Sequence, residues 1–588
     1  DSVLLMFPHW TPEEYLEWLR SNPEYLSSYA KYCEVDSIVL GQAWDKFRAA
    51  VETCFRALSN SLGYCLIGKP PSILVDDYVT LPQMVYKHWD AWQQSMGSNQ
   101  WITEREYDFF RMFLKGGRSQ QVRGHYTQPL LYGDVVSLYP AAQMMFPYPK
   151  ASAGLLGVDV FIPDKLGVYC LKWLKWPEEW QEWNPFPCKD YKSDRLHWSV
   201  REVQTVFVTS VDLLMADQVG ATYAVDWGYV WEETENPFCA FLSHFMQGKQ
   251  AEDARPAEER NAALRMVYKL AMNALYGKMS QHPVEHIYEE CDRKYVEEHG
   301  TTTLKGRKWK EMLNRIDARG VDIISYHELE GYVRVLRKIT PEERTQLRFH
   351  PSHIAVFILA WSRYIMMHYI YKLRGRPLGC ETDSLIFPGE WQSDIPVNTT
   401  YKTSDCWQDT DWTVEGCIHR FHTRSVVAWG SELGNMVNEG LSKYNTMCAD
   451  EAYLCAPKVY ALRFHDTWHF RWKGVSLRDR HGVPLVELSH FKQLLADGWC
   501  TMDKQTQFRR VKPWASRGGC VAISQQNKRI RLPNDVDVEA SRARAEQGYT
   551  DSVDWMYLQG LVTPMRGEAG KRTIEERDRG EEEGNQTR

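Results

Sequence analysis

The sequence has 588 residues, of which 44% are hydrophobic and 25% are charged. These values are typical of a folded protein of about three to five domains and exclude a disordered chain, and no apolar run reaches the roughly 18 residues of a membrane-spanning helix, so no membrane partner is expected. The net charge of −7 means that any nucleic-acid-binding surface has to be local. The cysteines include no C-x-x-C pair, which disfavours a zinc ribbon and a disulfide framework and indicates a reducing, intracellular environment.

The first carboxylate of interest follows an apolar strand. Leu130 to Pro140 read LLYGDVVSLYP, which predicts a strand, then Asp134, then a turn in which Ser137 caps a helix. A carboxylate at the end of a buried strand is well placed to hold a metal ion. The alternative is that Asp134 is an ordinary turn residue.

Two stretches differ in pattern from the rest of the chain. Residues 158–235 contain strand-like pieces, VDVF and GVYCLKW, between turns rich in Pro and Trp, which indicates an inserted module. Residues 285–344 are charged and have few core positions, so we expect a second, more exposed insertion.

A helix is predicted between these insertions. Arg265 to Met279 have a helical pattern that we expect to end near Gly277. Lys269, Asn273 and Tyr276 are spaced i, i+4 and i+7 and therefore share one face. An ammonium, an amide and an aromatic ring on one face suit a nucleoside triphosphate, although such a face by itself is more often a surface stripe.

A second carboxylate lies in a predicted hairpin. In LGCETDSLIF, residues 378–387, Asp383 sits between two apolar runs. If this hairpin lies beside the strand of Asp134, the two carboxylates come together and need a divalent cation between them. Two Mg²⁺ ions roughly 3.5 to 4 Å apart would then catalyse in-line attack on a phosphate. The alternative is again a turn residue.

The C-terminal part contains a basic segment and a charged tail. Between Lys504 and Leu532 the chain has no acidic residue and eight basic ones: Lys504, Arg509, Arg510, Lys512, Arg517, Lys528, Arg529 and Arg531. This favours contact with a duplex backbone over a merely solvated face. Residues 566–588 have too few apolar side chains to fold, so we expect a disordered tail.

Together these segments resemble the B-family DNA polymerases. DVVSLYP at 134–140 is similar to motif A, KLAMNALYG at 269–277 to motif B, and ETDS at 381–384 to motif C. The resemblance implies an α+β fold of the right-hand type. Its implied parts are the palm at 59–157 and 345–464, the fingers at 236–284 and the thumb at 465–565.

The resemblance implies template-directed addition of deoxynucleotides to a primer 3′-hydroxyl. Asp134, Val135 and Asp383 would bind two Mg²⁺ ions, for which Mn²⁺ can substitute. The nucleotide-binding residues would be Tyr139, Lys249, Lys269, Asn273 and Tyr276, with Arg260 as a competitor of Lys249 for the triphosphate. An inactive scaffold that binds primer and template is the alternative. An RNA polymerase is disfavoured because motif C lacks paired aspartates and Tyr139 is present.

Further motifs imply contacts with DNA. CAPKVYAL at 455–462 resembles the K-x-Y motif, which places Lys458 and Tyr460 on the primer, and Ser384 of motif C is a further primer-binding position. FLKGGRS at 113–119 is similar to the Y-x-G-G link before the polymerase domain, with Leu114 in place of Tyr, which implies that Gly116, Gly117 and Arg118 contact DNA. Glu381 replaces the first aspartate of motif C, and we expect it to adjust geometry and not to abolish activity.

The insertions at 158–235 and 285–344 are similar to the two terminal-protein regions of the protein-primed branch. This implies a protein primer and an element replicated inside a virus-infected cell or, for a plasmid, a mitochondrion.

Residues 1–58 resemble the end of a proofreading exonuclease domain, because Tyr32 and Asp36 have the Y-x-x-x-D spacing of its third motif. Pro8 to Trp18 predict a helix capped by Thr11, not a D-x-E strand, so we expect an incomplete or lost exonuclease and no proofreading.

Overall fold

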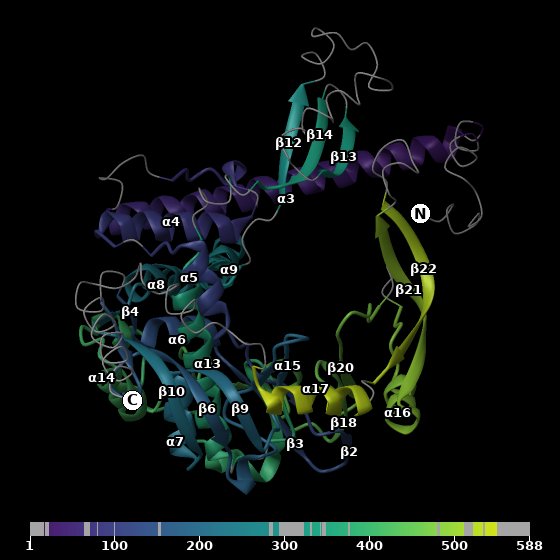
Figure 1. Ribbon diagram of the computed structural model, residues 1–588. Coiled ribbons are helices and arrows are strands. Elements are labelled where there is room, and N and C mark those ends of the chain that lie inside the picture. Colours follow the sequence, from purple (N-terminus) through teal and green to yellow (C-terminus); the bar gives the residue numbers. More distant parts are fainter. Residues whose placement is uncertain are drawn as a thin grey trace, which may run out of the picture. The chain divides into compact units, whose positions relative to one another are not determined.

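The computed structural model describes Glu17, Ser21 and residues 23–63, 71–78, 80–98, 100–150, 154–281, 286–292, 323–329, 332–340, 343, 349–373, 375, 377–478, 483–510, 521–532 and 535–549 (Figure 1). The chain forms two compact units. The first comprises Asp1–Met96 and Phe241–Leu275, and the second comprises Gly97–Ala240 and Tyr276–Arg588.

The first unit is helical. Its helices are α3 (Pro23–Leu62), α4 (Leu81–Ser95), most of α8 (Cys239–Ala254) and most of α9 (Ala262–Met279). Aromatic rings form its core: Phe55 lies 4.7 Å from His88 and 6.0 Å from Phe245 between ring centroids. Tyr32 and Asp36 lie on α3, but their side chains, like the predicted helix at 8–18 apart from Glu17, lie outside the described residues.

Helices α8 and α9 pack closely at one glycine. A Cβ atom on Gly248 would lie 2.3 Å from the Tyr268 ring, so a larger residue there would force the two helices apart. Helix α9 ends at Met279, the last residue of the predicted helix and close to Gly277, as expected. Its last four residues, from Tyr276, belong to the second unit.

The second unit contains an antiparallel five-stranded sheet with the order β1-β15-β16-β3-β17. These strands are β1 (Ser119–Gln121), β15 (Gly379–Glu381), β16 (Ser384–Pro388), β3 (Leu130–Val135) and β17 (Met436–Asn438). The predicted strand at 130–135 and the predicted hairpin at 378–387 are therefore confirmed, and they are neighbours in the sheet.

Helix α13 (Ser352–Lys372) is buried in the same unit beside α6 (Leu138–Met145). Trp361 of α13 stacks on Phe146 at 4.3 Å between centroids, and its indole N–H donates to the Pro147 carbonyl at 3.0 Å. The expectation that no segment is long and apolar enough to cross a membrane is wrong for α13, which has a mean hydropathy of 1.3. However, 94% of this segment is buried inside the protein, as in a core helix, so it is weak evidence for a membrane span.

The first predicted insertion is a four-stranded antiparallel sheet with the order β5-β10-β6-β9. Its elements are β5 (Leu155–Val158), β6 (Gly167–Lys175), the hairpin β7 (Cys188–Asp190) and β8 (Arg195–His197), β9 (Glu202–Thr209), α7 (Ser210–Gln218) and β10 (Thr222–Trp231). GVYCLKW lies in β6 as predicted, but of VDVF only Val158 lies in a strand, and helix α7 is not anticipated from the sequence. A capping box between Thr209 and Asp212 begins α7.

The second predicted insertion is described only in part. Strands β12 (His286–Asp292), β14 (Tyr332–Lys338) and β13 (Ile323–Leu329) form an antiparallel sheet in that spatial order (Figure 1). Residues 293–322, which connect β12 to β13, lie outside the described residues.

The C-terminal part begins with strands β18 (Glu451–Ala456), β19 (Val459–Phe464) and β20 (Thr467–Trp472). They form a four-stranded sheet with β2 (Gly124–Tyr126), which comes from much earlier in the chain. After α16 (Leu488–Asp497), strands β21 (Trp499–Arg510) and β22 (Val521–Arg531) pair as a long hairpin (Figure 1). Helix α17 (Asp535–Gln547) then packs on the first insertion, where the buried Asp190 carboxylate accepts hydrogen bonds from Ser541 at 2.7 Å and Arg544 at 2.8 Å. The predicted tail at 566–588 lies outside the described residues.

Further described helices and strands are α5 (Glu104–Arg111), β4 (Tyr148–Pro149), β11 (Thr234–Glu235), α14 (Val414–Thr423) and α15 (Glu439–Tyr444). Ten cysteines of the described residues are free thiols.

Candidate active site

Asp134 and Asp383 lie at the ends of neighbouring strands. In the register of β3 and β16, Asp134 pairs with Ser384, the residue after Asp383. The Val135 N–H donates to the Asp383 carbonyl at 2.7 Å, so the backbones that carry the two carboxylates are joined by a direct hydrogen bond. The structure thus brings together the three residues predicted to bind metal.

A tight turn sets the position of Asp383. Thr382, between β15 and β16, has a φ of 63°, an unfavourable conformation for a β-branched residue. Its N–H donates to the Arg118 carbonyl at 2.6 Å, and the Asp383 N–H donates to the Glu381 carbonyl at 2.7 Å. The loop at Arg118 therefore supports the turn from outside the hairpin.

The surroundings of Asp383 favour a cation. The side chain is half-buried, and this burial raises its pKa. A backbone hydrogen bond and Lys458 oppose the shift, whereas the carboxylates of Glu439 and Glu381 add to it. The local positive charge is therefore insufficient to keep this carboxylate in its ordinary pKa range.

Glu439 is an acidic residue of this region that the sequence analysis does not identify. It begins α15 directly after β17, and β17 pairs with β3 beside Asp134. Its carboxylate forms an ion pair with Lys443 in the same helix. The sequence signal for Glu439 was a carboxylate directly after a short strand. That strand lies beside Asp134 only because β17 pairs with β3, and the paired residues are about 300 positions apart in the sequence.

Tyr139 and Tyr276 stack on each other. Their ring centroids are 3.8 Å apart and the ring planes differ by 17°. Burial is the main cause that raises the pKa of Tyr139, and the Tyr276 hydroxyl adds to it. Ser137 occupies the cap position of α6, but with a φ of 48° it makes no side-chain capping bond, so its expected capping role is wrong.

The other predicted nucleotide-binding residues belong to the first unit. Lys269 is exposed on α9, and the Asn273 amide donates to the Lys269 carbonyl at 2.8 Å. Lys249 forms an ion pair with Asp253 at 2.8 Å. Its competitor Arg260 donates to the carbonyl oxygens of Glu252 and Asp253, so its guanidinium is used to hold the turn between α8 and α9.

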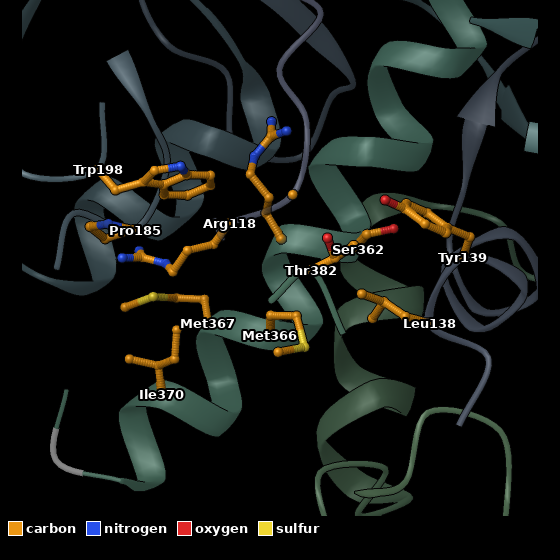
Figure 2. Close-up of a pocket in the computed structure, with 12 residues that line it drawn as sticks. Arg118, Leu138, Tyr139, Pro185, Trp198, Ser362, Met366, Met367, Ile370 and Thr382 are labelled. Carbon is orange, nitrogen blue, oxygen red and sulfur yellow. The ribbon is translucent and has the colours of Figure 1, made fainter. Parts of the chain in front are cut away.

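Arg118 is buried and not available to DNA. Its guanidinium lies 4.8 Å from the ring centroid of Trp183 and 4.4 Å from that of Trp198, and it donates to the Asn184 carbonyl. Figure 2 shows Arg118 beside Trp198 and Pro185 in a pocket that Tyr139 lines from the other side. The side chain is 4% exposed, so the expectation that it contacts DNA is not supported by its position.

The pocket in Figure 2 is too small for a nucleotide. Its volume of about 10 Å³ holds roughly one water molecule. The two glycines of the predicted link differ in their surroundings: a Cβ on Gly117 would lie 3.1 Å from Cγ2 of Thr382, whereas a Cβ on Gly116 would meet only Leu196, at 3.9 Å. Gly117 therefore allows the link to lie against the turn that carries Asp383.

The two residues of the K-x-Y motif have different positions. Lys458 is exposed in the turn between β18 and β19 and has a φ of 59°. Tyr460 is 3% exposed, and its hydroxyl lies 3.2 Å from that of Tyr132. Tyr460 therefore packs in the hydrophobic core with Tyr132. The expectation that its side chain contacts the primer does not fit this burial.

Comparison with known protein families assigns this chain to one family. The family described as DNA polymerase type B, organellar and viral, matches residues 13–374, more than half of the chain. A DNA polymerase of Kluyveromyces lactis is 25% identical over 264 residues, covering 44% of this chain and 24% of that protein. The DNA polymerase of bovine adenovirus B serotype 3 is 23% identical over 458 residues, covering 62% of this chain and 44% of its own length. The chain thus spans less than half of the length of these curated relatives.

A solved structure of Phi29 DNA polymerase complexed with primer-template DNA has a TM-score of 0.50 at 15% identity, covering 77% of this chain and 68% of that chain. This likeness concerns the fold alone. It confirms the expected α+β architecture of the right-hand type.

Proposed function

Because this chain belongs to the type-B DNA polymerases of organelles and viruses, we propose that it adds deoxynucleotides to a primer 3′-hydroxyl under the direction of a DNA template. The observation that carries the proposal is the hydrogen bond between Val135 and Asp383, which holds two strand-end carboxylates together. The expected loss of nucleotide addition when either aspartate is replaced is the experiment that tests it.

The donor atoms at this site fit Mg²⁺. Mg²⁺ is typically held by one or two carboxylates, and substrate phosphates and water complete its coordination. Asp134 and Asp383 supply such carboxylates from neighbouring strands. Two bound Mg²⁺ ions, or Mn²⁺ in their place, would activate the primer hydroxyl and stabilise the leaving pyrophosphate.

The protein's own side chains would position the nucleotide. We assign the Tyr139 ring to the sugar, since its stacking on Tyr276 restricts it to one orientation. Lys269 is assigned to the triphosphate because it is exposed and forms no ion pair with any of the described residues. We retain Lys249 as the second phosphate ligand over Arg260, whose guanidinium is already bonded to backbone carbonyls, and Asn273 as a neighbour of Lys269 on the same helical face.

DNA contacts follow from charge and exposure. The hairpin β21–β22 carries basic residues and no acidic residue from Lys504 to Arg510 and from Val521 to Arg531, which suits a phosphate backbone. Lys458 is exposed near Asp383, and we assign it to the primer terminus with the backbone of Gly116 and Gly117. Ser384 is 5% exposed and pairs with Asp134 in the sheet, so its expected contact with the primer does not fit this burial.

A catalytically inactive scaffold that binds primer and template is the alternative function. Such a scaffold needs neither the two aspartates proposed to bind metal, Asp134 and Asp383, nor the stacked rings of Tyr139 and Tyr276. Retention of DNA binding without any nucleotide addition by the unmodified chain would favour it.

We further propose that replication starts on a protein primer, with the polymerase working inside a host cell or organelle. The support is the pair of modules at 158–235 and 285–344, where the resemblance implies contacts with a terminal protein. A protein primer has to use the same basic channel as DNA and then leave it. Modules beside the channel would hold such a primer and later enclose the duplex.

Shortening the second module tests this enclosing role. Strands β12 and β13 both run antiparallel to β14, so the connection at 293–322 has to return along roughly 20 Å of strand. A Gly/Ser linker of about 12 residues spans that distance and keeps the three strands. We expect this replacement to shorten products on a primed circular template by about fivefold or more and to leave single-nucleotide addition unchanged, since an enclosed duplex dissociates less often.

A linker of the original length with its charges replaced by Ser and Gly is the control that separates enclosure from local charge. Product lengths equal to those of the unmodified chain for both replacements would remove the enclosing role.

A further inference from the structure

Glu381 stands at the junction of three segments that are distant in the sequence. Its Oε2 accepts a hydrogen bond from the Ser119 hydroxyl at 2.5 Å, and its Oε1 accepts one from the Gln121 amide at 3.1 Å. The same Oε1 accepts the backbone N–H of Lys458 at 2.5 Å. One carboxylate thus joins β1, the end of β15 and the turn between β18 and β19.

Two of these segments contain a residue in a conformation that needs support. Lys458 and Thr382 have φ values of 59° and 63°, in the left-handed region that side chains other than glycine rarely adopt. Glu381 bonds the amide of the first and directly precedes the second. Hydrogen bonds to an ionised acceptor are stronger than those between neutral groups, so this carboxylate is suited to hold both turns.

Glu381 also contacts the turn that carries Asp383. Its carbonyl oxygen accepts the Asp383 N–H at 2.7 Å, while its carboxylate accepts the Lys458 N–H. One residue therefore bonds to both turns, and one of them carries the carboxylate at which nucleotide addition is proposed to occur.

We propose that Glu381 is a positioning residue that fixes the Lys458 turn against the Asp383 turn, so that the primer terminus is bound in place, and that it does not bind metal. This inference rests on the proposed polymerase function. A glutamate fits this role because its extra methylene extends the carboxylate away from the hairpin to the Lys458 amide and the β1 side chains, while Asp383 remains at the metal-binding position.

The prediction concerns Glu381→Gln, which keeps the length of the side chain and removes its charge, and Glu381→Asp, which keeps the charge and shortens the side chain. We expect each to raise the KM for primer–template about tenfold, and to change kcat at saturating primer by less than about threefold. The reason differs between them: glutamine offers the Lys458 N–H only a neutral, weaker acceptor, and the aspartate carboxylate is too short to reach it. The Mg²⁺ concentration for half-maximal activity should not change. Ser119→Ala should act in the same direction, and adding it to Glu381→Gln should have little further effect, because both act through one network.

Glu390→Gln is the matched control, since this glutamate is exposed beyond the other end of β16. Amide hydrogen exchange provides a readout that does not depend on activity. The Lys458 amide should exchange at least tenfold faster in both Glu381 variants than in the unmodified chain and in Glu390→Gln.

The outcomes are distinguishable. If the unmodified chain adds no nucleotide, the polymerase function fails, while the exchange rate at Lys458 still tests the positioning contact. An unchanged exchange rate and an unchanged KM for primer would overturn the positioning role. A shift of the half-maximal Mg²⁺ concentration by more than about tenfold in Glu381→Gln would make Glu381 a metal ligand and also overturn the proposal.

Discussion

Replacing Asp383 or Asp134 with alanine is expected to reduce nucleotide addition by at least about 1000-fold, or roughly 4 kcal/mol of transition-state stabilisation. Each change removes one of the two strand-end carboxylates proposed to hold Mg²⁺. The remaining aspartate alone cannot bind both ions. The measurement is single-nucleotide addition to a labelled DNA primer in Mg²⁺, with saturating primer–template so that kcat is observed.

Two controls separate lost chemistry from lost structure. Asp466→Ala removes an exposed carboxylate from the turn between β19 and β20 and should leave the rate unchanged. The affinity of both active-site variants for primer–template should stay within a few-fold of the unmodified value, because neither aspartate is assigned to DNA. Addition above about a tenth of the original rate in either variant would exclude that aspartate as an essential metal ligand.

Replacing Tyr139 with valine is expected to weaken discrimination against ribonucleotides by about 100-fold, measured as the ratio of kcat/KM for deoxynucleotides and ribonucleotides. The aromatic ring is held by Tyr276 at 3.8 Å, so it cannot easily move away from an additional 2′-hydroxyl. A valine side chain is too short to fill that space, and the sugar with its hydroxyl can then be accommodated.

Tyr139→Phe is the matched control, because it keeps the ring and the stacking on Tyr276. It should retain the discrimination of the unmodified chain. If Tyr139 is only a packing residue, valine should lower the melting temperature and leave the ratio unchanged, and that combination would exclude a role in sugar selection.

Local motifs of the site were predictable because they depend on short-range patterns. An apolar run followed by Asp134 reads as a strand and a turn, and two apolar runs around Asp383 read as a hairpin. Their side-by-side arrangement was only a condition of the metal-site hypothesis, because no local pattern specifies which strands pair. Helix α9 was predicted for the same local reason, and it ends at Met279, near Gly277 as expected.

The positions of Arg118, Tyr460 and Glu439 depend on contacts between distant segments. Arg118 appeared to be a DNA ligand because its motif gives its identity but not its burial, which is due to Trp183 and Trp198 of a later module. Tyr460 is buried in a core cluster that includes Tyr132, 328 positions earlier in the sequence, to which its hydroxyl is hydrogen-bonded. Glu439 was missed because its relevance depends on the pairing of β17 with β3. No short stretch of the sequence contains information about any of these long-range contacts.

If the chain copies a DNA template, the template base decides which nucleotide is added, so nucleotide addition should be measured opposite each of the four template bases. Four primer–templates that differ only in the first unpaired template base are each offered the four deoxynucleotides singly, in Mg²⁺. We expect the complementary nucleotide to be added with a kcat/KM at least about 1000-fold above the others on every template, and a chelator to abolish addition. Addition whose base preference does not change with the template, or no addition by a chain that still binds the primer–template, would contradict it.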